Sequence, residues 1–278
     1  MILKSFSKIN LSLNVNQKLK SGLHQIQTYF CLINLFDKIV IKKIQSRNDV
    51  VTFRGKFAKY VDKKKNSICE TLTILRKKKI INNYYSVTIY KKIPVYAGLG
   101  GGTSNAFSLI KYFNRGKISK DLLSILNKKV GTDFQLFLYN QAFLANLKKI
   151  ISLKKKFNLC FLLVYPNVNS STKSVYSKVK NFTSRSEFNF NHISSKSKFL
   201  KLLIKKSNDL QPVVEKRYPI IKELLADIYP KKGCYFSRMT GSGSVCYGVF
   251  KSKKLAKAAS VELKLKYPKF WFLVTKTI

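Results

Sequence analysis

The chain has 278 residues, of which 54 are Lys or Arg and 12 are Asp or Glu, giving a formal net charge of +42. Hydrophobic residues make up 45% and aromatic residues 13% of the chain, which is enough apolar material for a packed core. This composition excludes a disordered basic tail, which would be poor in aromatic and branched side chains. The length suits one large domain or two small ones.

The basic charge comes almost entirely from Lys, because only seven of the 54 basic residues are Arg. A protein adapted to grip nucleic-acid phosphates would be expected to use more Arg, whose guanidinium matches phosphate geometry. The basic runs 63–65, 76–79 and 154–156 are scattered rather than gathered in one arm. They indicate a solvated surface, so we expect no specific nucleic-acid partner.

The five cysteines lie far apart, and no two of them form a Cys-x-x-Cys pair. With only His24 and His192 beside them, no zinc spacing exists, and we assign no metal ligands. An odd number of cysteines without a disulfide framework is typical of a reducing compartment. The apolar stretches are far shorter than a membrane span. Patterned sequence follows Met1 at once, so we expect no targeting segment. We expect a soluble cytoplasmic protein without a membrane partner.

The first ninety residues are rich in strand patterns. Apolar residues alternate with polar ones over 9–15, the period-two pattern of a half-buried strand. One helix interrupts the strands over 66–75, where Asn66 can cap the first turn. Further strands are predicted near 39–41, 50–53 and 86–93.

The remainder of the chain alternates helices with apolar strands around one polar stretch, 167–198. In chain order we predict helices at 103–113 and 120–129, a strand at 157–165, helices at 199–206 and 219–228, a strand at 245–250, a helix at 253–265 and a strand at 270–274. This mixture predicts an α+β fold in two lobes. The Lys-rich break near residue 150 places the boundary between an N-terminal lobe, 1–152, and a C-terminal lobe, 153–278.

The strongest local signal is the glycine-rich segment that runs from Pro94 to Ser104. Four of the twelve glycines fall within residues 98–102, between a predicted strand and a predicted helix. Glycine allows close backbone approach, so successive N–H groups and the following helix N-terminus can bind an anion. Thr103 and Ser104 add hydroxyl donors, and Thr103, Ser104 and Asn105 resemble a helix cap. The segment fits neither a Walker A loop nor the dinucleotide-binding fingerprint, and it predicts a polyphosphate site rather than a flexible turn.

Three shorter segments carry candidate polar residues. Asp133 is one of only 12 acids and lies among apolar neighbours, so it is either a helix cap or a functional acid or base. Lys8 and Asn10 can share the polar face of an early strand, or Lys8 can simply face solvent. The small-residue segment 239–244 is by itself most simply a tight turn.

Together these segments resemble the GHMP kinase superfamily. The motifs that carry the resemblance are Ser-Lys-Ile-Asn-Leu at 7–11, Gly-Leu-His at 22–24, the glycine segment, Gly-Thr-Asp at 131–133 and Met-Thr-Gly-Ser-Gly-Ser at 239–244. Within the superfamily the chain is most similar to the kinases that act on 4-diphosphocytidyl-2-C-methyl-D-erythritol, and the similarity runs from about Lys4 to Phe250. The resemblance implies an N-terminal lobe like domain 2 of ribosomal protein S5 and a ferredoxin-like C-terminal lobe.

The resemblance also implies an activity and its residues. The expected reaction is transfer of phosphate from ATP, with Mg²⁺, to the 2-hydroxyl of this cytidine diphosphate alcohol in non-mevalonate isoprenoid synthesis. Asp133 would be the general base, and Lys8 beside it would orient the hydroxyl and hold Asp133 ionised. Asn10, His24, Tyr176 and Asp133 would contact the substrate, and the segment 240–244 would close over the cleft. The ATP-binding residues would be Asn66, near adenine, and Pro94, Val95, Tyr96, Ala97, Gly98, Leu99, Gly100, Gly101, Gly102, Thr103 and Ser104.

The chain departs from the family pattern at three places. Leu23 replaces the usual Tyr, which removes an aromatic face from the cytosine site, and Gln135 replaces a common Pro. The residues 146–149 stand where the family has a Gly-x-Gly-Glu stretch. Base stacking is worth about 1–3 kcal/mol, so the first departure leaves open another GHMP kinase whose substrate lacks cytosine. The high charge leaves open a basic nucleic-acid-binding protein on the same scaffold. We expect the protein to be a monomer or a weak homodimer.

Overall fold

A computed structural model describes residues 1–186 and 193–278. His192 and part of the predicted polar stretch lie outside the described residues. The chain forms two compact units, and each is built from separate segments of the sequence. Unit 1 comprises residues 1–8, 35–95 and 100–138, and unit 2 comprises residues 9–34, 96–99 and 139–278. The division at residue 152 follows chain order instead and stays a prediction.

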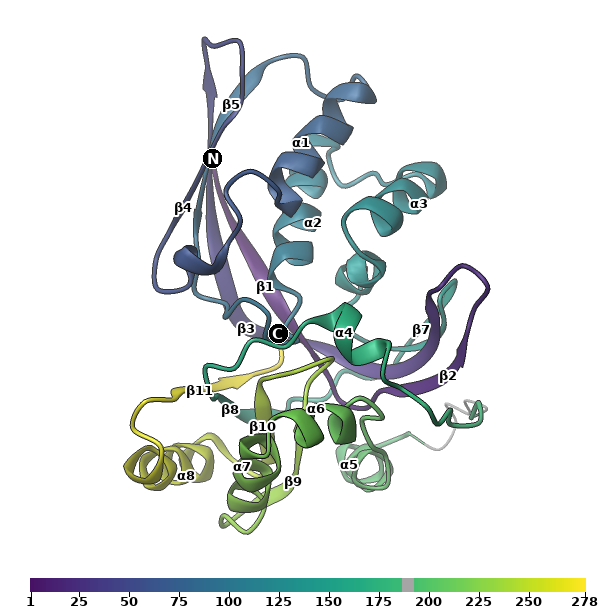
Figure 1. The fold of residues 1–278 in the computed structure, drawn as a ribbon, viewed down its shortest axis with the longest axis vertical. Helices are drawn as coiled ribbons and strands as arrows, with labels where there is room; N and C mark the ends of the chain where they lie inside the picture. Colours follow the sequence, from purple (N-terminus) through teal and green to yellow (C-terminus); the bar gives the residue numbers. More distant parts are fainter. Residues whose placement is uncertain (187–192) are drawn as a thin grey trace. The chain divides into compact units, whose positions relative to one another are not determined.

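Unit 1 is a sheet whose one face is covered by three helices, as Figure 1 shows. Its strands are β1 (Ile2–Asn10), the later part of β3 (His24–Ile44), β4 (Val50–Arg54) and β5 (Tyr84–Tyr90). Its helices are α1 (Ser67–Lys77), α2 (Gly101–Phe113) and α3 (Lys120–Lys129), with two short 3-10 turns, η1 (Ala58–Tyr60) and η2 (Thr132–Leu138). β5 pairs antiparallel with β3 and parallel with β4. Apolar side chains of β3 and β5 pack against the helices to form the core of the unit.

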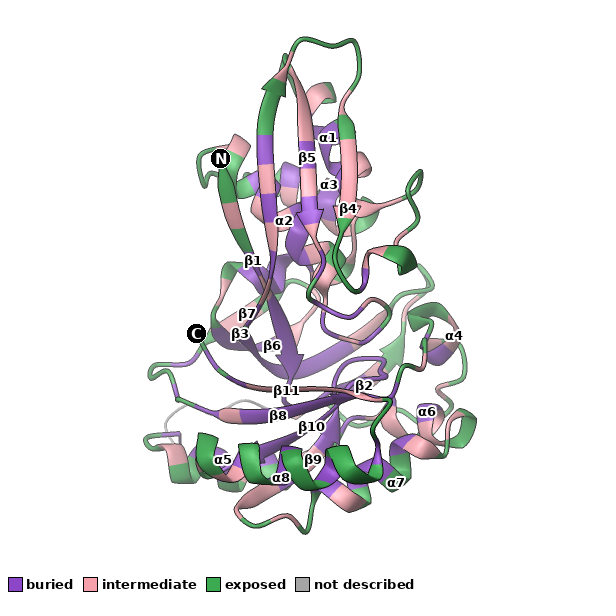
Figure 2. Cartoon of the chain, turned by 90° about the vertical axis from the view of Figure 1, so that its left-hand side faces the viewer, coloured by how far each residue is buried: buried purple, intermediate pink, exposed green. Residues whose placement is uncertain are grey.

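Unit 2 contains a four-stranded antiparallel sheet in the order β11-β8-β10-β9. The strands are β8 (Cys160–Tyr165), β9 (Cys234–Met239), β10 (Cys246–Phe250) and β11 (Trp271–Lys276). The helices are α4 (Thr172–Tyr176), α5 (Lys196–Ile204), α6 (Gln211–Arg217), α7 (Ile220–Ile228) and α8 (Lys253–Lys266). Figure 2 shows α5, α7 and α8 together on one face of this sheet. The chain order of strands and helices, β8-α-β9-β10-α8-β11, is that of a ferredoxin-like fold, which confirms the expectation.

The rest of unit 2 is formed by the start of β3 and three strands beside it. β2 (Asn14–Lys18) and β6 (Gln141–Asn146) pair antiparallel with β3, and β7 (Lys149–Ser152) pairs with β6. β6 and β7 were not expected from the sequence, nor was β9, because their residues show no clean period-two alternation.

Most of the predicted elements are present within a few residues of their expected ends. The strand predicted near 39–41 is part of the much longer β3, and the strand predicted over 9–15 is not formed. β1 ends at Asn10 and β2 begins at Asn14, and residues 7–15 are all buried rather than alternately exposed. The polar positions are buried because they are hydrogen-bonded inside unit 2. Asn10 donates from Nδ2 to Thr28 Oγ1 at 3.0 Å, and Ser12 Oγ accepts from the Tyr29 N–H. A buried polar side chain with a partner therefore imitates the sequence pattern of a solvent-facing one.

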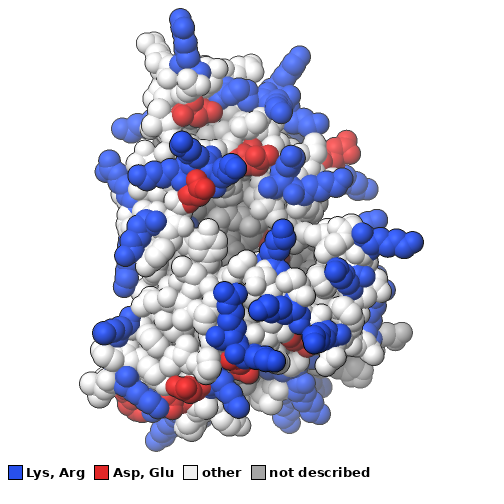
Figure 3. Space-filling model, in the orientation of Figure 1, with Lys and Arg blue, Asp and Glu red and all other residues white. Residues whose placement is uncertain are grey.

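Figure 3 shows how the charged residues are distributed on one face of the molecule. On the face drawn in Figure 3, Lys and Arg side chains are spread among uncharged residues, with a few acids between them. On this face the mixture of charged and uncharged residues is typical of a solvated basic surface. Within the described residues, no helix combines the length and apolar character that a membrane span requires.

Candidate active site

The glycine segment links β5 to α2 and needs glycine at two positions for different reasons. Gly98 has φ +75°, and a Cβ there would lie 2.1 Å from the carbonyl oxygen of Thr240, so no side chain fits. Gly100 has φ +68°, and a Cβ there would lie 3.0 Å from Phe137 Cζ and 3.3 Å from Lys8 Cε. Both residues adopt the left-handed conformation that glycine reaches without steric cost. The glycines thus allow close backbone packing as well as the turn itself.

Helix α2 begins one turn earlier than the predicted cap. Gly100 is the N-cap residue and makes no side-chain cap, while Thr103, Ser104 and Asn105 lie within the first helical turns. The expected Thr-Ser-Asn cap is therefore wrong. The first N–H groups of a helix have no partner within it, and here they belong to Gly101, Gly102 and Thr103. The start of α2 consequently presents backbone donors and the positive end of a helix dipole, which suits a phosphate.

Ser104 does not offer its hydroxyl to this site. The side chain is 1% exposed, and Oγ donates to the carbonyl oxygen of Phe6 at 2.5 Å and lies 2.7 Å from Ser5 Oγ. Its N–H bonds to the Gly100 carbonyl at 2.9 Å. Ser104 anchors α2 to β1, which leaves Thr103, half-buried in the same turn, as the available hydroxyl.

Lys8 and Asp133 form an ion pair beside the start of α2. Lys8 Nζ lies 3.2 Å from Asp133 Oδ2, with Lys8 3% exposed and the Asp133 side chain 34% exposed. Lys8 comes from β1 and Asp133 from the first turn of η2. The Lys8 side chain also passes close to Gly100, since a Cβ on that glycine would meet its Cγ and Cε at 3.3 Å. A buried ammonium, a carboxylate open to solvent and a phosphate-binding helix start therefore lie together in unit 1.

Asn66 caps α1 and has little side-chain capacity left for a nucleotide. Its Oδ1 accepts from the N–H groups of Ile68 and Cys69, at 3.1 and 3.0 Å, as the sequence predicts. Its Nδ2 donates to the carbonyl oxygens of Asp62 and Lys63, at 3.0 and 3.2 Å. Any contact of this position with adenine would therefore come from its backbone or its neighbours.

Three aromatic rings gather in unit 2. The ring centroids of His24 and Tyr176 are 5.0 Å apart with planes 34° from parallel, and that of Phe182 is 6.4 Å from His24. Burial and the nearby Lys18 lower the pKa of His24 from 6.5, which keeps the imidazole neutral at pH 7. Phe182 was not expected, because only its aromatic character within a polar stretch distinguishes it. Leu23 is 46% exposed next to this cluster in the sequence.

Asn10 lies at a junction of buried hydrogen bonds in unit 2. Its N–H donates to Thr240 Oγ1 at 3.0 Å, and Thr240 is fully buried. The segment 239–244 is held in turn by Asn208, whose Nδ2 donates to the carbonyl oxygens of Met239 and Gly241, both at 2.8 Å. This segment is therefore more than the tight turn that the local sequence suggests. Asn208 was not expected, because a single Asn in a loop carries no distinctive sequence signal.

Comparison with known families gives the same assignment as these motifs. Residues 196–269 match the family described as GHMP kinases C terminal. The chain is 36% identical over 281 residues to the 4-diphosphocytidyl-2-C-methyl-D-erythritol kinase of Pelagibacter ubique (strain HTCC1062), covering 99% of this chain and 98% of that one. It is 31% identical over 284 residues to the kinase of the same name from Wolbachia sp. subsp. Drosophila simulans (strain wRi), covering 99% and 98%.

Solved structures agree on the fold. A crystal structure of 4-(cytidine 5'-diphospho)-2C-methyl-D-erythritol kinase matches with a TM-score of 0.75 and 20% identity, and covers all of both chains. A homoserine kinase from Cytophaga hutchinsonii matches with a TM-score of 0.70 and 14% identity, over 100% of this chain and 94% of that one. With relatives above 30% identity over nearly its whole length, the chain belongs to the 4-diphosphocytidyl-2-C-methyl-D-erythritol kinase family of the GHMP kinases.

Proposed function

We propose that this chain transfers the γ-phosphate of ATP to the 2-hydroxyl of 4-diphosphocytidyl-2-C-methyl-D-erythritol, in non-mevalonate isoprenoid synthesis. The Lys8–Asp133 pair beside the start of α2 is the observation that carries the proposal. Phosphoryl transfer needs a positioned nucleophile, a proton acceptor and stabilisation of the charge on the phosphates, and little further covalent chemistry. The names of the relatives supply the substrate.

In this mechanism Asp133 is the general base. Its carboxylate takes the proton of the substrate hydroxyl while that oxygen attacks the γ-phosphorus, and ADP leaves with the electron pair of the broken bond. Lys8 holds the carboxylate by the 3.2 Å ion pair and orients the hydroxyl oxygen with its ammonium. Because Lys8 is nearly fully buried, its charge is poorly screened by water and acts strongly at short range.

ATP would bind along residues 94–104, with its phosphates at the N-terminus of α2. The N–H groups after Gly100 and the Thr103 hydroxyl support this placement, whereas Ser104 and Asn66 would contribute through their backbone or by holding their neighbours. Mg²⁺ would accompany ATP and neutralise the charge that develops on the phosphates. Mg²⁺ usually keeps several waters and is bound through substrate phosphates, and we name no residue of the chain as its ligand. Within the described residues no three His, Cys, Asp or Glu form a group that could hold a metal ion.

The cytosine would lie against the aromatic cluster of unit 2, with Asn10 also near the substrate. Tyr176 and His24 are the residues expected for this role. Leu23 lacks the aromatic ring that the family has at its position, and the Phe182 ring would take the place of that ring. We further propose a cytoplasmic monomer or weak homodimer without a nucleic-acid or membrane partner. The five free cysteines support the reducing compartment.

The direct test is phosphate transfer from Mg·ATP to 4-diphosphocytidyl-2-C-methyl-D-erythritol by the purified protein. Asp133→Asn keeps the shape of the side chain and removes the base, so kcat is expected to fall by about 10²–10⁴. Asp121→Asn, at an exposed acid in α3, is the control and should turn over at the wild-type rate. Absence of turnover by the folded wild type would overturn the substrate assignment. Wild-type turnover by Asp133→Asn would overturn the base.

A further inference from the structure

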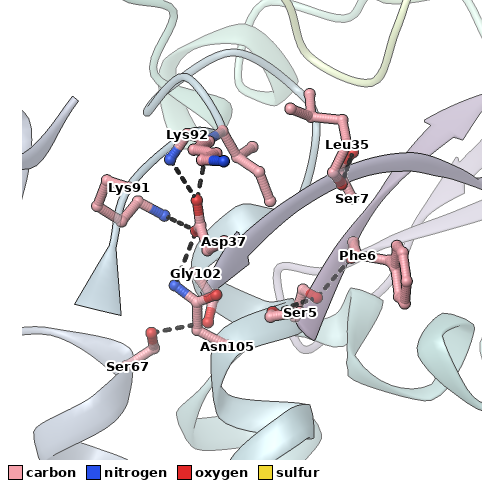
Figure 4. A network of polar contacts seen from close by, with 12 residues as sticks. Ser5, Phe6, Ser7, Leu35, Asp37, Ser67, Lys91, Lys92, Gly102 and Asn105 are labelled. Carbon is pink, nitrogen blue, oxygen red and sulfur yellow. Dashed lines mark hydrogen bonds and ion pairs between the residues drawn. The ribbon is translucent and has the colours of Figure 1, made fainter. Parts of the chain in front are cut away.

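A buried carboxylate on β3 is bonded to residues on both sides of the glycine segment. Asp37 is fully buried in unit 1, and Figure 4 shows it between Lys91, Lys92 and Asn105. Its Oδ1 accepts from the N–H groups of Lys92 at 2.7 Å and Ile93 at 2.9 Å. Its Oδ2 accepts from Lys91 Nζ and from Asn105 Nδ2, the latter at 3.1 Å. Four donors therefore converge on one side chain.

All four donors come from residues directly before the glycine segment or directly after it. The Lys91 N–H still bonds to the Arg54 carbonyl oxygen, at 2.7 Å. Lys92 and Ile93 follow the end of β5 and have left the strand, so their N–H groups need another acceptor. Asn105 lies in the second turn of α2. The Lys91 ammonium reaches the start of this helix as well, because a Cβ on Gly101 would lie 3.4 Å from Nζ. Asp37 thus connects the residues just before the glycine segment to the residue just after it.

Stability alone is a poor account of this arrangement. The desolvation free energy of burying an ion pair offsets much of the attraction between its charges. Replacing such a pair by apolar residues is therefore often neutral or stabilising. The amide of Asn105 is turned so that Nδ2 meets Asp37, and its buried Oδ1 then has no hydrogen-bond partner among the described residues. An orphaned buried oxygen is a cost that an arrangement built only for stability would avoid.

We infer that Asp37 is a positioning residue for nucleotide binding, which sets the spacing between residues 91–93 and the first turns of α2. The paired charges of Asp37 and Lys91 nearly cancel, so the network fixes the positions of its partners and adds little to the electrostatic potential at the phosphates. Anion binding by backbone N–H groups depends on their directions, and these directions depend on both ends of the segment being fixed. Because Asp37 is fully buried and already accepts from four donors, it would act through these neighbours rather than by contacting ATP or the substrate. The inference rests on the proposed binding of ATP by residues 94–104.

The test measures binding of a non-hydrolysable ATP analogue by isothermal titration, on protein shown to be folded by circular dichroism. Asp37→Asn keeps the size of the side chain but turns a donor toward Lys91 and Asn105. We expect its dissociation constant for the analogue to rise by about 10- to 100-fold. In turnover assays KM for ATP should rise while KM for the second substrate stays unchanged. A merely structural role would instead lower the active fraction and leave the dissociation constant alone.

The matched control is Asp49→Asn in the same unit. Asp49 also pairs with a basic side chain, Arg76 at 2.8 Å, and also accepts a backbone N–H, from Tyr85 at 2.8 Å, but none of its partners adjoins the glycine segment. Its variant should bind the analogue as the wild type does. If Asp37→Asn fails to fold, Asn105→Ala tests the inference in its place, because it removes one donor to Asp37 without leaving an unpaired charge. This variant should still weaken binding of the analogue several-fold.

Two results would overturn the inference. One is wild-type affinity for the analogue in the folded Asp37 and Asn105 variants, and the other is equal weakening by Asp49→Asn. Because the experiment measures nucleotide binding, its result does not depend on which second substrate the protein phosphorylates. A wild type that binds the analogue but does not phosphorylate the proposed substrate would refute the proposed function alone.

Discussion

Replacing Gly98 with Ala tests whether the glycine segment needs glycine for close packing as well as for its turn. At φ +75° any residue with a Cβ is strained by about 1–2 kcal/mol. The added Cβ would also lie 2.1 Å from the Thr240 carbonyl oxygen and 3.2 Å from the Gly243 nitrogen. Backbone atoms cannot swing away as a side chain does, so we add about 1–3 kcal/mol for the forced displacement. The expected loss in the free energy of unfolding is about 2–5 kcal/mol.

Gly22→Ala is the matched control, because Gly22 lies in the same unit at φ +81° with nothing within 4 Å of its Cβ position. This variant carries the conformational strain without the collision and should lose only about 1–2 kcal/mol. The assay is urea unfolding followed by the fluorescence of Trp271, the single tryptophan, which lies on β11 of unit 2. With a slope of about 1–3 kcal/mol per molar urea, Gly98→Ala should shift the midpoint by about 1–2 M. Equal shifts in the two variants would refute the packing argument.

Three further outcomes are expected. Tyr176→Ala and Phe182→Ala should each raise KM for the cytidine substrate by about 5- to 150-fold and leave KM for ATP unchanged. The control Tyr112→Ala should change neither KM. An unchanged substrate KM in one of the two variants would show that its ring does not bind the base. Burial, with a neighbouring lysine, lowers the pKa of His24 from 6.5, so the unfolded chain binds its proton first as pH falls. Stability should therefore be greatest above pH 6.5 and decrease below it, and His24→Gln should flatten that decrease in urea titrations at each pH. Asn66→Ala should lower the free energy of unfolding by about 0.5–2 kcal/mol through loss of the helix cap, and a large rise in KM for ATP at unchanged stability would contradict the capping role.

The sequence alone determines those features that depend on neighbours a few residues apart. Periodicity and a capping Asn predict α1 almost to the residue, and the glycine segment is apparent because its residues are consecutive. The family motifs extend this to Asp133, Lys8, His24 and Tyr176 as candidates, and the family itself is confirmed by the relatives. Local rules suffice here because the interactions that stabilise a cap or a turn are themselves local.

Only the tertiary structure decides which distant side chains meet. It directs the Ser104 hydroxyl to β1 and brings Phe182 near His24, and it sets the 3.2 Å distance of the Lys8–Asp133 pair that the family motifs imply. It also collects the donors around Asp37, a residue that the local sequence does not distinguish from any other acid. Such contacts depend on how strands and helices pack, and many sequences with the same local pattern would pack differently. The local pattern therefore predicts which residues can do chemistry, and the packing determines which of them are close enough to do it.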